Sequence, residues 1–197
     1  MIEFINFIIE NLRMKKKINS SEIQVGDIGL VDSYSLLARM IKFFMKVYCK
    51  LLRLPVRKFY NHAFLVVDIW GTMYVAEALG KGITVTPWES TWYKGSSRVK
   101  ILRPKKELGE QEKKDLSRIA VTYALQPTRY DFLNFILQII LILTGKWIGP
   151  KGKKARKRLY CSEAAATWIN EVRPGTFKAP EATNPLDIDL NENFYPV

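Results

Sequence analysis

The chain has 197 residues, 48% of them hydrophobic and 25% charged, with a formal net charge of +12 at pH 7. This length and composition suit one folded domain with a substantial core and argue against intrinsic disorder. Two cysteines do not make a disulfide framework, which favours a reducing compartment. The single histidine, without a cluster of cysteine and acidic side chains at metal-ligand spacing, does not support a zinc site. We therefore expect no metal and no cofactor.

The excess positive charge is concentrated in short clusters, and the densest one runs from residue 151 to 158. Such clusters attract nucleic acid, acidic lipid headgroups or anionic wall polymers. No helix-turn-helix signature, zinc-finger spacing or aromatic-basic repeat accompanies the charge, which argues against nucleic acid. We expect an anionic membrane or wall polymer to be the partner of this cluster, whose basic residues are Lys151, Lys153, Lys154, Arg156, Lys157 and Arg158.

The first twelve residues are apolar at helical spacing, and the basic run Lys15 to Lys17 follows them. This order is the reverse of a secretion signal, and no small-residue cleavage site follows. The pattern predicts a short amphipathic helix that packs on the body or lies on a membrane surface. We divide the chain into an N-terminal helix and basic linker, residues 1–22, and a domain, residues 23–197. The expected location is cytoplasmic or peripheral to a membrane.

Elements of both kinds follow along the domain. A turn at Gly26-Asp27 leads into a short strand, and apolar spacing from Ser35 to about Leu54 predicts an amphipathic helix. Two strand-like runs, residues 61–69 and 73–78, are joined by Trp70-Gly71-Thr72 and predict an antiparallel hairpin. A strand is expected from Ser97 to Leu102 and a helix from Glu107 to Ala124.

The apolar segment 132–143 is too short for a bilayer-spanning helix, which needs about 20 residues, and it predicts a buried or interfacial helix. A loop from Gly145 to Gly152 and the basic run lead on to Cys161. These patterns predict an α+β fold in which a small antiparallel sheet packs against helices.

One of those helices is expected to begin at Cys161. Ala164 to Ala166 favour helix, and Glu163 in the first turn suits the positive end of the helix dipole. Free N–H groups at such an end lower a thiol pKa and can receive a developing oxyanion. The alternative is that Cys161 is a small buried residue, which is how we interpret Cys49 on the helix before the hairpin.

The predicted hairpin carries two polar side chains suited to acid–base chemistry. His62, the only histidine, opens the first strand, and Glu77 lies inside the second. A lone histidine is often structural, but glutamate disfavours strands and is costly to bury unpaired. If the strands pair, His62 and Glu77 can face one another, although the sequence does not determine the register.

The order His62, Glu77, Cys161 resembles that of the circularly permuted papain-like hydrolases of the NlpC type, in particular the YiiX-like group. In ordinary papain-like enzymes the cysteine precedes the histidine. The resemblance spans about residues 23 to 190. It rests on six short segments in order: Val25-Gly26-Asp27-Ile28, Asn61-His62-Ala63, Val75-Ala76-Glu77-Ala78, Tyr130-Asp131-Phe132, Tyr160-Cys161-Ser162-Glu163 and Asn184-Pro185-Leu186-Asp187.

The resemblance implies a permuted papain-like fold, with a small antiparallel sheet or half-barrel packed against helices and the cysteine at a helix N-terminus. It also implies that Cys161 is the nucleophile, His62 its acid–base partner and Glu77 the residue that orients the imidazole. The N–H of Cys161 would form part of an oxyanion hole, with Tyr160 or Tyr130 as helpers.

The sequence leaves three functions open. The first is a cysteine hydrolase that cleaves an amide, for example in a cell-wall peptide, through an acyl-thioester. The second is a lipid-directed thiol acyltransferase or esterase, suggested by the apolar segment 132–143 beside the basic cluster. Lecithin-retinol acyltransferase relatives share the permutation, but their Asn-Cys-Glu-His motif is absent around Cys161. The third is a non-catalytic cationic binding module, against which the presence of all three triad residue types argues.

Overall fold

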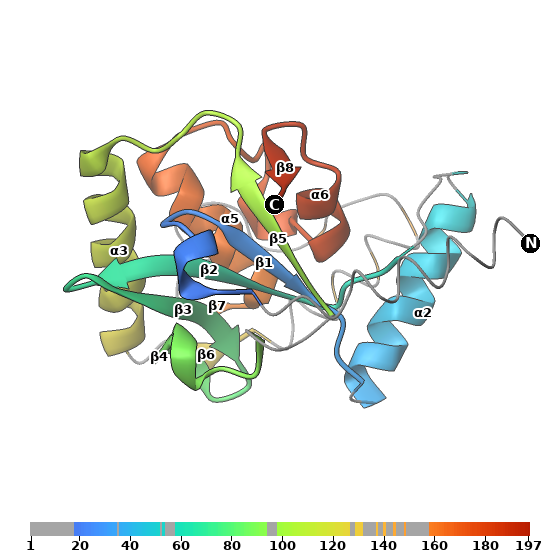
Figure 1. Cartoon of the computed structure of the whole chain (residues 1–197). Coiled ribbons are helices and arrows are strands. Elements are labelled where there is room, and N and C mark those ends of the chain that lie inside the picture. The colour runs from blue at the N-terminus through green and yellow to red at the C-terminus, as the bar shows by residue number, and fades with distance from the viewer. Residues whose placement is uncertain are drawn as a thin grey trace, which may run out of the picture.

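The structure, a computed structural model, describes residues 18–34, 36–51, 53, 58–93, 98–126, 129–131, 137, 140, 144, 148 and 158–197. Over these ranges the chain forms the predicted α+β fold, a six-stranded antiparallel sheet with helices packed against it (Figure 1). The strand order across the sheet is β4-β3-β2-β1-β5-β8. The strands are β1 (Ile28–Val31), β2 (His62–Ile69), β3 (Thr72–Leu79), β4 (Gly82–Pro87), β5 (Val99–Pro104) and β8 (Phe194–Pro196).

The hairpin of β2 and β3 is antiparallel, as predicted, and its register pairs Leu65 with Ala76. Trp70 and Gly71 form the turn, and both take left-handed φ angles, +54° and +80°. Asp68 accepts the N–H of Gly71 through Oδ1 at 2.8 Å, which closes the turn. A two-residue turn of this kind matches the right-handed twist of the flanking strands.

Alternation along the strands gives the sheet two apolar faces. On one face, Leu30, Ala63 and Leu65 belong to the main core together with residues of α3 (Glu110–Leu125) and α5 (Cys161–Val172). Figure 1 shows these two helices on the same side of the sheet. On the other face, Phe64 and Val75 pack with Trp88 and Tyr93 in a smaller cluster around η2 (Trp88–Ser90).

A buried ion pair holds the start of β1 against β5. Asp27 is fully buried and accepts two hydrogen bonds from Arg103, from Nε at 2.9 Å and from Nη2 at 2.8 Å. The N–H of Gln24 donates to the same carboxylate at 2.8 Å. A buried carboxylate tolerates its lost hydration only when it is paired and hydrogen-bonded in this way. The Gly26-Asp27 turn predicted from sequence is therefore a structural anchor.

The remaining elements lie around the sheet. They are η1 (Ser20–Glu22), α2 (Leu36–Leu51), β6 (Arg129–Tyr130), β7 (Arg158–Leu159), η5 (Pro180–Ala182) and α6 (Pro185–Asp189). Figure 1 shows α2 beyond one end of the sheet, and Met45 and Cys49 on it pack with Leu186 of α6. The strands β6 and β7 form a separate parallel pair.

Several predictions fall on residues that the structure does not describe. The predicted N-terminal helix, residues 1–12, lies outside the described residues, and so does the basic cluster except for the backbone of Arg158 in β7. Of the apolar segment 132–143, only residues 137 and 140 are described. The domain boundary at residue 22 thus stays a prediction. Among the described residues, no helix combines the length and apolar character needed to cross a bilayer.

Candidate active site

The two polar residues of the hairpin meet at one end of the sheet. Nε2 of His62 lies 2.6 Å from Oε2 of Glu77, and both side chains are largely buried, with 15% and 6% of their surface exposed. If the observed register is extended by one residue, Glu77 comes opposite Phe64 and therefore diagonal to His62. Diagonal neighbours in an antiparallel pair are within reach of long side chains. The strand pairing thus determines this contact.

The backbone of β2 at His62 is anchored by the residue before it. Asn61 is buried, and its Oδ1 accepts the N–H of Ser33 at 2.7 Å while its Nδ2 donates to Oγ of Ser33 at 2.8 Å. The N–H of Asn61 also donates to the carbonyl oxygen of Val31 at 2.9 Å. These contacts tie the start of β2 to the loop after β1, so the position of His62 does not depend on its own side chain alone.

Cys161 is the first residue of α5, as the sequence predicted for the start of this helix. Its side chain interacts with His62, and the N–H groups of Ala63 and Ser162 donate to its sulfur. Burial alone would raise the pKa of the thiol, but the charge and hydrogen bond of His62 and the two N–H groups outweigh burial, and the pKa is lowered. The ring of His62 therefore lies between Cys161 and Glu77.

The pKa of the His62 imidazole is shifted in the opposite direction to that of the Cys161 thiol. Burial alone would lower its pKa, but the charge of Cys161, together with hydrogen bonds to Cys161 and Glu77, raises the pKa to about 10. Nε2 is taken by Glu77, which leaves Nδ1 for the sulfur of Cys161. A lowered thiol pKa beside a raised imidazole pKa favours a thiolate–imidazolium pair at neutral pH.

Tyr93 is a member of this cluster that sequence reasoning missed. Its hydroxyl donates to Oε2 of Glu77 at 2.7 Å, the same oxygen that contacts His62. Tyr93 follows η2 and lies 16 residues after Glu77, so no spacing within one helix or strand links the two residues. A buried tyrosine hydroxyl usually finds a partner, but the sequence does not say which one.

The two tyrosines expected to assist the oxyanion hole, Tyr160 and Tyr130, have different surroundings. The hydroxyl of Tyr160 lies 2.9 Å from the carbonyl oxygen of Thr183 and 3.1 Å from that of Glu181, to which it can donate. Oγ of Ser162 donates to the same Thr183 oxygen at 2.8 Å. These contacts anchor the start of α5 to the segment before α6. Tyr130 lies in β6, where its backbone pairs with Leu159, two residues before Cys161.

The second cysteine has a different environment. Cys49 is buried on α2 against Met45 and Leu186, and burial raises the pKa of its thiol. A buried thiol without an electropositive neighbour is normally inert. The two cysteines of the chain therefore differ in the direction of their pKa shifts, which makes Cys49 an internal reference for Cys161.

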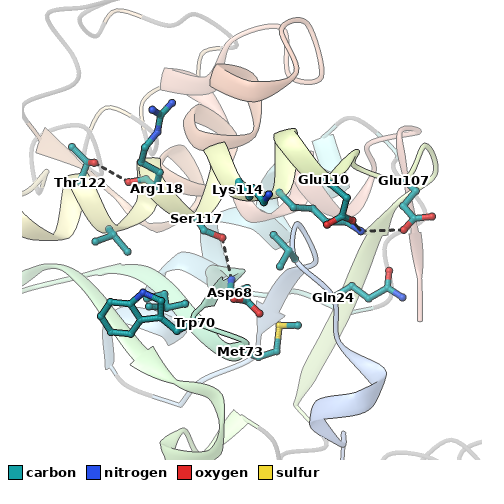
Figure 2. A pocket seen from close by; sticks show the side chains of 14 residues that line it. Gln24, Asp68, Trp70, Met73, Glu107, Glu110, Lys114, Ser117, Arg118 and Thr122 are labelled. Carbon is teal, nitrogen blue, oxygen red and sulfur yellow. Dashed lines mark hydrogen bonds and ion pairs between the residues drawn. The ribbon is translucent and has the colours of Figure 1, made fainter.

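A large cavity of about 940 Å³ lies elsewhere, between α3 and the β2–β3 hairpin. Figure 2 shows its lining, in which Met73 and Trp70 from the hairpin lie below Ser117 and Lys114 of α3. The described lining does not include Cys161, His62 or Glu77. This cavity is thus separate from the candidate active site.

Comparison with known proteins finds a likeness in structure. No family model matches the chain, and no curated protein matches it by sequence. Among solved structures, it is similar to the crystal structure of the metalloprotein YiiX from Escherichia coli O157:H7, at 18% sequence identity and a TM-score of 0.60. The likeness covers 88% of this chain and 96% of that one.

YiiX is a metalloprotein. Among the described residues, no group of three or more histidine, cysteine, aspartate or glutamate side chains is placed to hold a metal ion. Nε2 of the single histidine is already hydrogen-bonded to Glu77. These described side chains do not fit a metal site. What the likeness shows is the fold: this chain has a YiiX-like fold.

Proposed function

We propose that the protein is a cysteine hydrolase that cleaves an amide through an acyl-thioester. One observation carries the proposal: the His62 ring lies between Cys161 and Glu77, with the thiol pKa lowered and the imidazole pKa raised. Pairs of groups whose pKa values are moved apart by their surroundings are typical of acid–base sites. The YiiX-like fold and the motif order are consistent with this chemistry.

The first half of the reaction acylates the enzyme. The Cys161 thiolate attacks the carbonyl carbon, a C–S bond forms, and the carbonyl oxygen becomes an oxyanion that backbone N–H groups at the start of α5 can receive. The imidazolium of His62 then gives its Nδ1 proton to the leaving nitrogen as the C–N bond breaks. An amine leaves, and an acyl group remains on sulfur.

The second half releases the acid. Neutral His62 takes a proton from water, whose oxygen attacks the thioester carbon, and the C–S bond breaks to give back the thiolate. The carboxylic acid leaves and the imidazolium is restored. In this scheme the Glu77 carboxylate stabilises the charged ring through Nε2, in the role that the acid has in other triads.

Trapping the acyl-enzyme tests the proposal. The protein is incubated with a panel of peptide p-nitroanilides and of short- and long-chain p-nitrophenyl esters. The reaction is quenched in acid, and the mass of the intact protein is measured by mass spectrometry. We expect an acyl adduct on Cys161 and a loss of turnover by about 10³-fold or more in Cys161→Ala. A preference for long-chain esters over amides would favour the lipid-directed alternative.

Cys49→Ala is the matched control, since it removes the other thiol from a site with no imidazole contact in the described residues. It should form the same adduct at the same rate as the unchanged protein. An adduct that persists in Cys161→Ala, or turnover that does not depend on Cys161, would rule out the proposed nucleophile.

A further inference from the structure

One carboxylate oxygen in the site receives two hydrogen bonds. Oε2 of Glu77 lies 2.6 Å from Nε2 of His62 and 2.7 Å from the hydroxyl of Tyr93. Glutamate has three side-chain torsions, and a single contact to His62 does not fix all three, so the carboxylate can still change its orientation. A second donor at a fixed point removes that freedom.

Tyr93 is itself held rigidly. Its ring stacks on Phe64 with centroids 4.6 Å apart and planes at 15°, and only 5% of its surface is exposed. Phe64 in turn lies over Gly29, where a Cβ would come within 1.9 Å of the ring. The hydroxyl is therefore held at a defined position against Glu77 by packing on a strand of the sheet.

The protonation state of Tyr93 suits this role. Burial, the charge of Glu77 and the hydrogen bond to Glu77 all raise the pKa of the phenol above its usual 10, and the charge of Cys161 adds to the effect. The hydroxyl stays a neutral donor at any pH at which the pair works. Among the described residues, the titratable groups that contact Glu77 are His62 on β2 and Tyr93 after η2, and Cys161 on α5 interacts with His62.

We propose that Tyr93 is a positioning residue for the hydrolase reaction: its hydroxyl holds the Glu77 carboxylate in the orientation from which Glu77 binds His62. The inference rests on the proposed function and adds a fourth residue to its site. Tyr93 acts through Glu77 and does not touch the reacting atoms. In metal sites, outer contacts of this kind commonly change affinity or activity by about ten- to a hundred-fold, and we expect an effect at the lower end of that range here.

Tyr93→Phe tests the proposal because it removes the hydroxyl and keeps the ring that stacks on Phe64. The probe is iodoacetamide, which needs no substrate, and the alkylation rate at Cys161 is followed by mass spectrometry from pH 5 to pH 10 in a Cys49→Ala background. We expect the rate at pH 6 to fall about tenfold, equivalent to a rise of one unit in the thiol pKa, and the rate at pH 9 to change less than twofold.

Thr84→Val is the matched control. Thr84 pairs directly with Glu77 across β3 and β4, and its Oγ1 has no hydrogen-bond partner among the described residues. Removing this hydroxyl beside the same carboxylate should leave the pH profile unchanged. If Thr84→Val and Tyr93→Phe slow alkylation equally, the effect is one of local packing and the positioning role of Tyr93 is wrong.

A double-mutant cycle shows whether Tyr93 acts through Glu77. In a Glu77→Gln background, adding Tyr93→Phe should change the pH 6 rate less than twofold, because the carboxylate that it positions is gone. Nuclear magnetic resonance supplies a second readout, since the one histidine of the chain gives an unambiguous ring signal. Its titration midpoint should fall in Tyr93→Phe and stay in Thr84→Val.

The outcomes separate this inference from the proposed function. Rapid alkylation at pH 6 in the unchanged site, lost in His62→Gln but kept in Tyr93→Phe, would overturn the role of Tyr93 alone. A faster rate in Tyr93→Phe would overturn it too, because it would mean that the hydroxyl only weakens the charge of Glu77. Slow alkylation at pH 6 in the unchanged site would overturn both proposals.

Discussion

Replacing His62 by glutamine is expected to slow the alkylation of Cys161 at pH 6 by about 10²-fold. The imidazolium is the main influence that lowers the pKa of this buried thiol, and without it burial moves the pKa upward. An ordinary thiol has a pKa near 8.5, so only a fraction of about 1 in 300 is thiolate at pH 6. The rate of iodoacetamide modification follows that fraction, because the thiolate is the nucleophile.

The pH profile of the alkylation rate reports the direction of both pKa shifts, the lowered one of Cys161 and the raised one of His62. In the unchanged site, the rate should rise as the pH passes through the lowered thiol pKa and then stay level through neutral pH. The raised pKa of His62 means that the ring keeps its proton until about pH 10, above which the thiolate loses its charged partner. In His62→Gln the alkylation rate should rise only as the pH reaches the pKa of an ordinary thiol or exceeds it.

Cys49 supplies the reference for this measurement within the same chain. Burial raises its pKa, so its alkylation should be slow below pH 8 and unaffected by His62→Gln. Cys49→Ala removes the background altogether. If Cys161 reacts at the same rate with and without His62 at pH 6, then the thiolate–imidazolium pair does not exist and the hydrolase proposal fails with it.

The parts of the fold with strong periodicity were predictable. The hairpin, the strand after Asp27 and the helices α2 and α3 appear within a few residues of their expected bounds, and α5 begins at the expected residue. Each has a long apolar pattern or a clear turn signal, and the α+β class follows from them. The start of α5 at Cys161 was predictable because helix-favouring residues follow the cysteine at once.

The strands β4 and β8 were not predicted. In β4, residues Gly82 to Pro87 include a glycine and a proline and are mostly half-buried, so the alternation is weak. This is what an edge strand allows, since β4 is at one edge of the sheet. In β8 only three residues pair, with β5, and such a short segment carries no period.

The site itself was predictable in its residue types but not in its contacts. A glutamate inside a strand stands out from sequence, whereas the diagonal contact of Glu77 with His62 depends on the register. The hydroxyl of Tyr93 reaches Glu77 from a segment beyond β4, through packing on Phe64. Contacts of this kind arise from tertiary structure, and no local pattern encodes them.

Gly29→Ala is expected to destabilise the fold by about 3 kcal/mol and to remove the low-pH reactivity of Cys161. The new Cβ would lie 1.9 Å from Cζ of Phe64 and 2.2 and 2.4 Å from its two Cε atoms, so the ring must move. Overpacking a core usually costs about 1–3 kcal/mol, and this overlap is severe. Urea unfolding measures the first effect, and alkylation at pH 6 measures the second.

Gly109→Ala is the control, because a methyl group there meets no atom closer than 3.6 Å. It should cost less than about 1 kcal/mol, as expected for the N-cap of α3, and leave alkylation unchanged. Equal destabilisation by the two alanines would show that the close packing of Phe64 on Gly29 contributes nothing.

Phe64→Leu in the Gly29→Ala background separates packing from positioning. Leucine lacks the three ring atoms that overlap the new methyl group, so part of the lost stability should return. The low-pH alkylation of Cys161 should not return, because Tyr93 then loses its parallel stacking on Phe64 and its hydroxyl is no longer fixed against Glu77. Recovery of both properties together would mean that the site depends only on a well-packed sheet. Recovery of stability alone would show that the packing at Gly29 affects the Glu77–His62 pair through Phe64 and Tyr93.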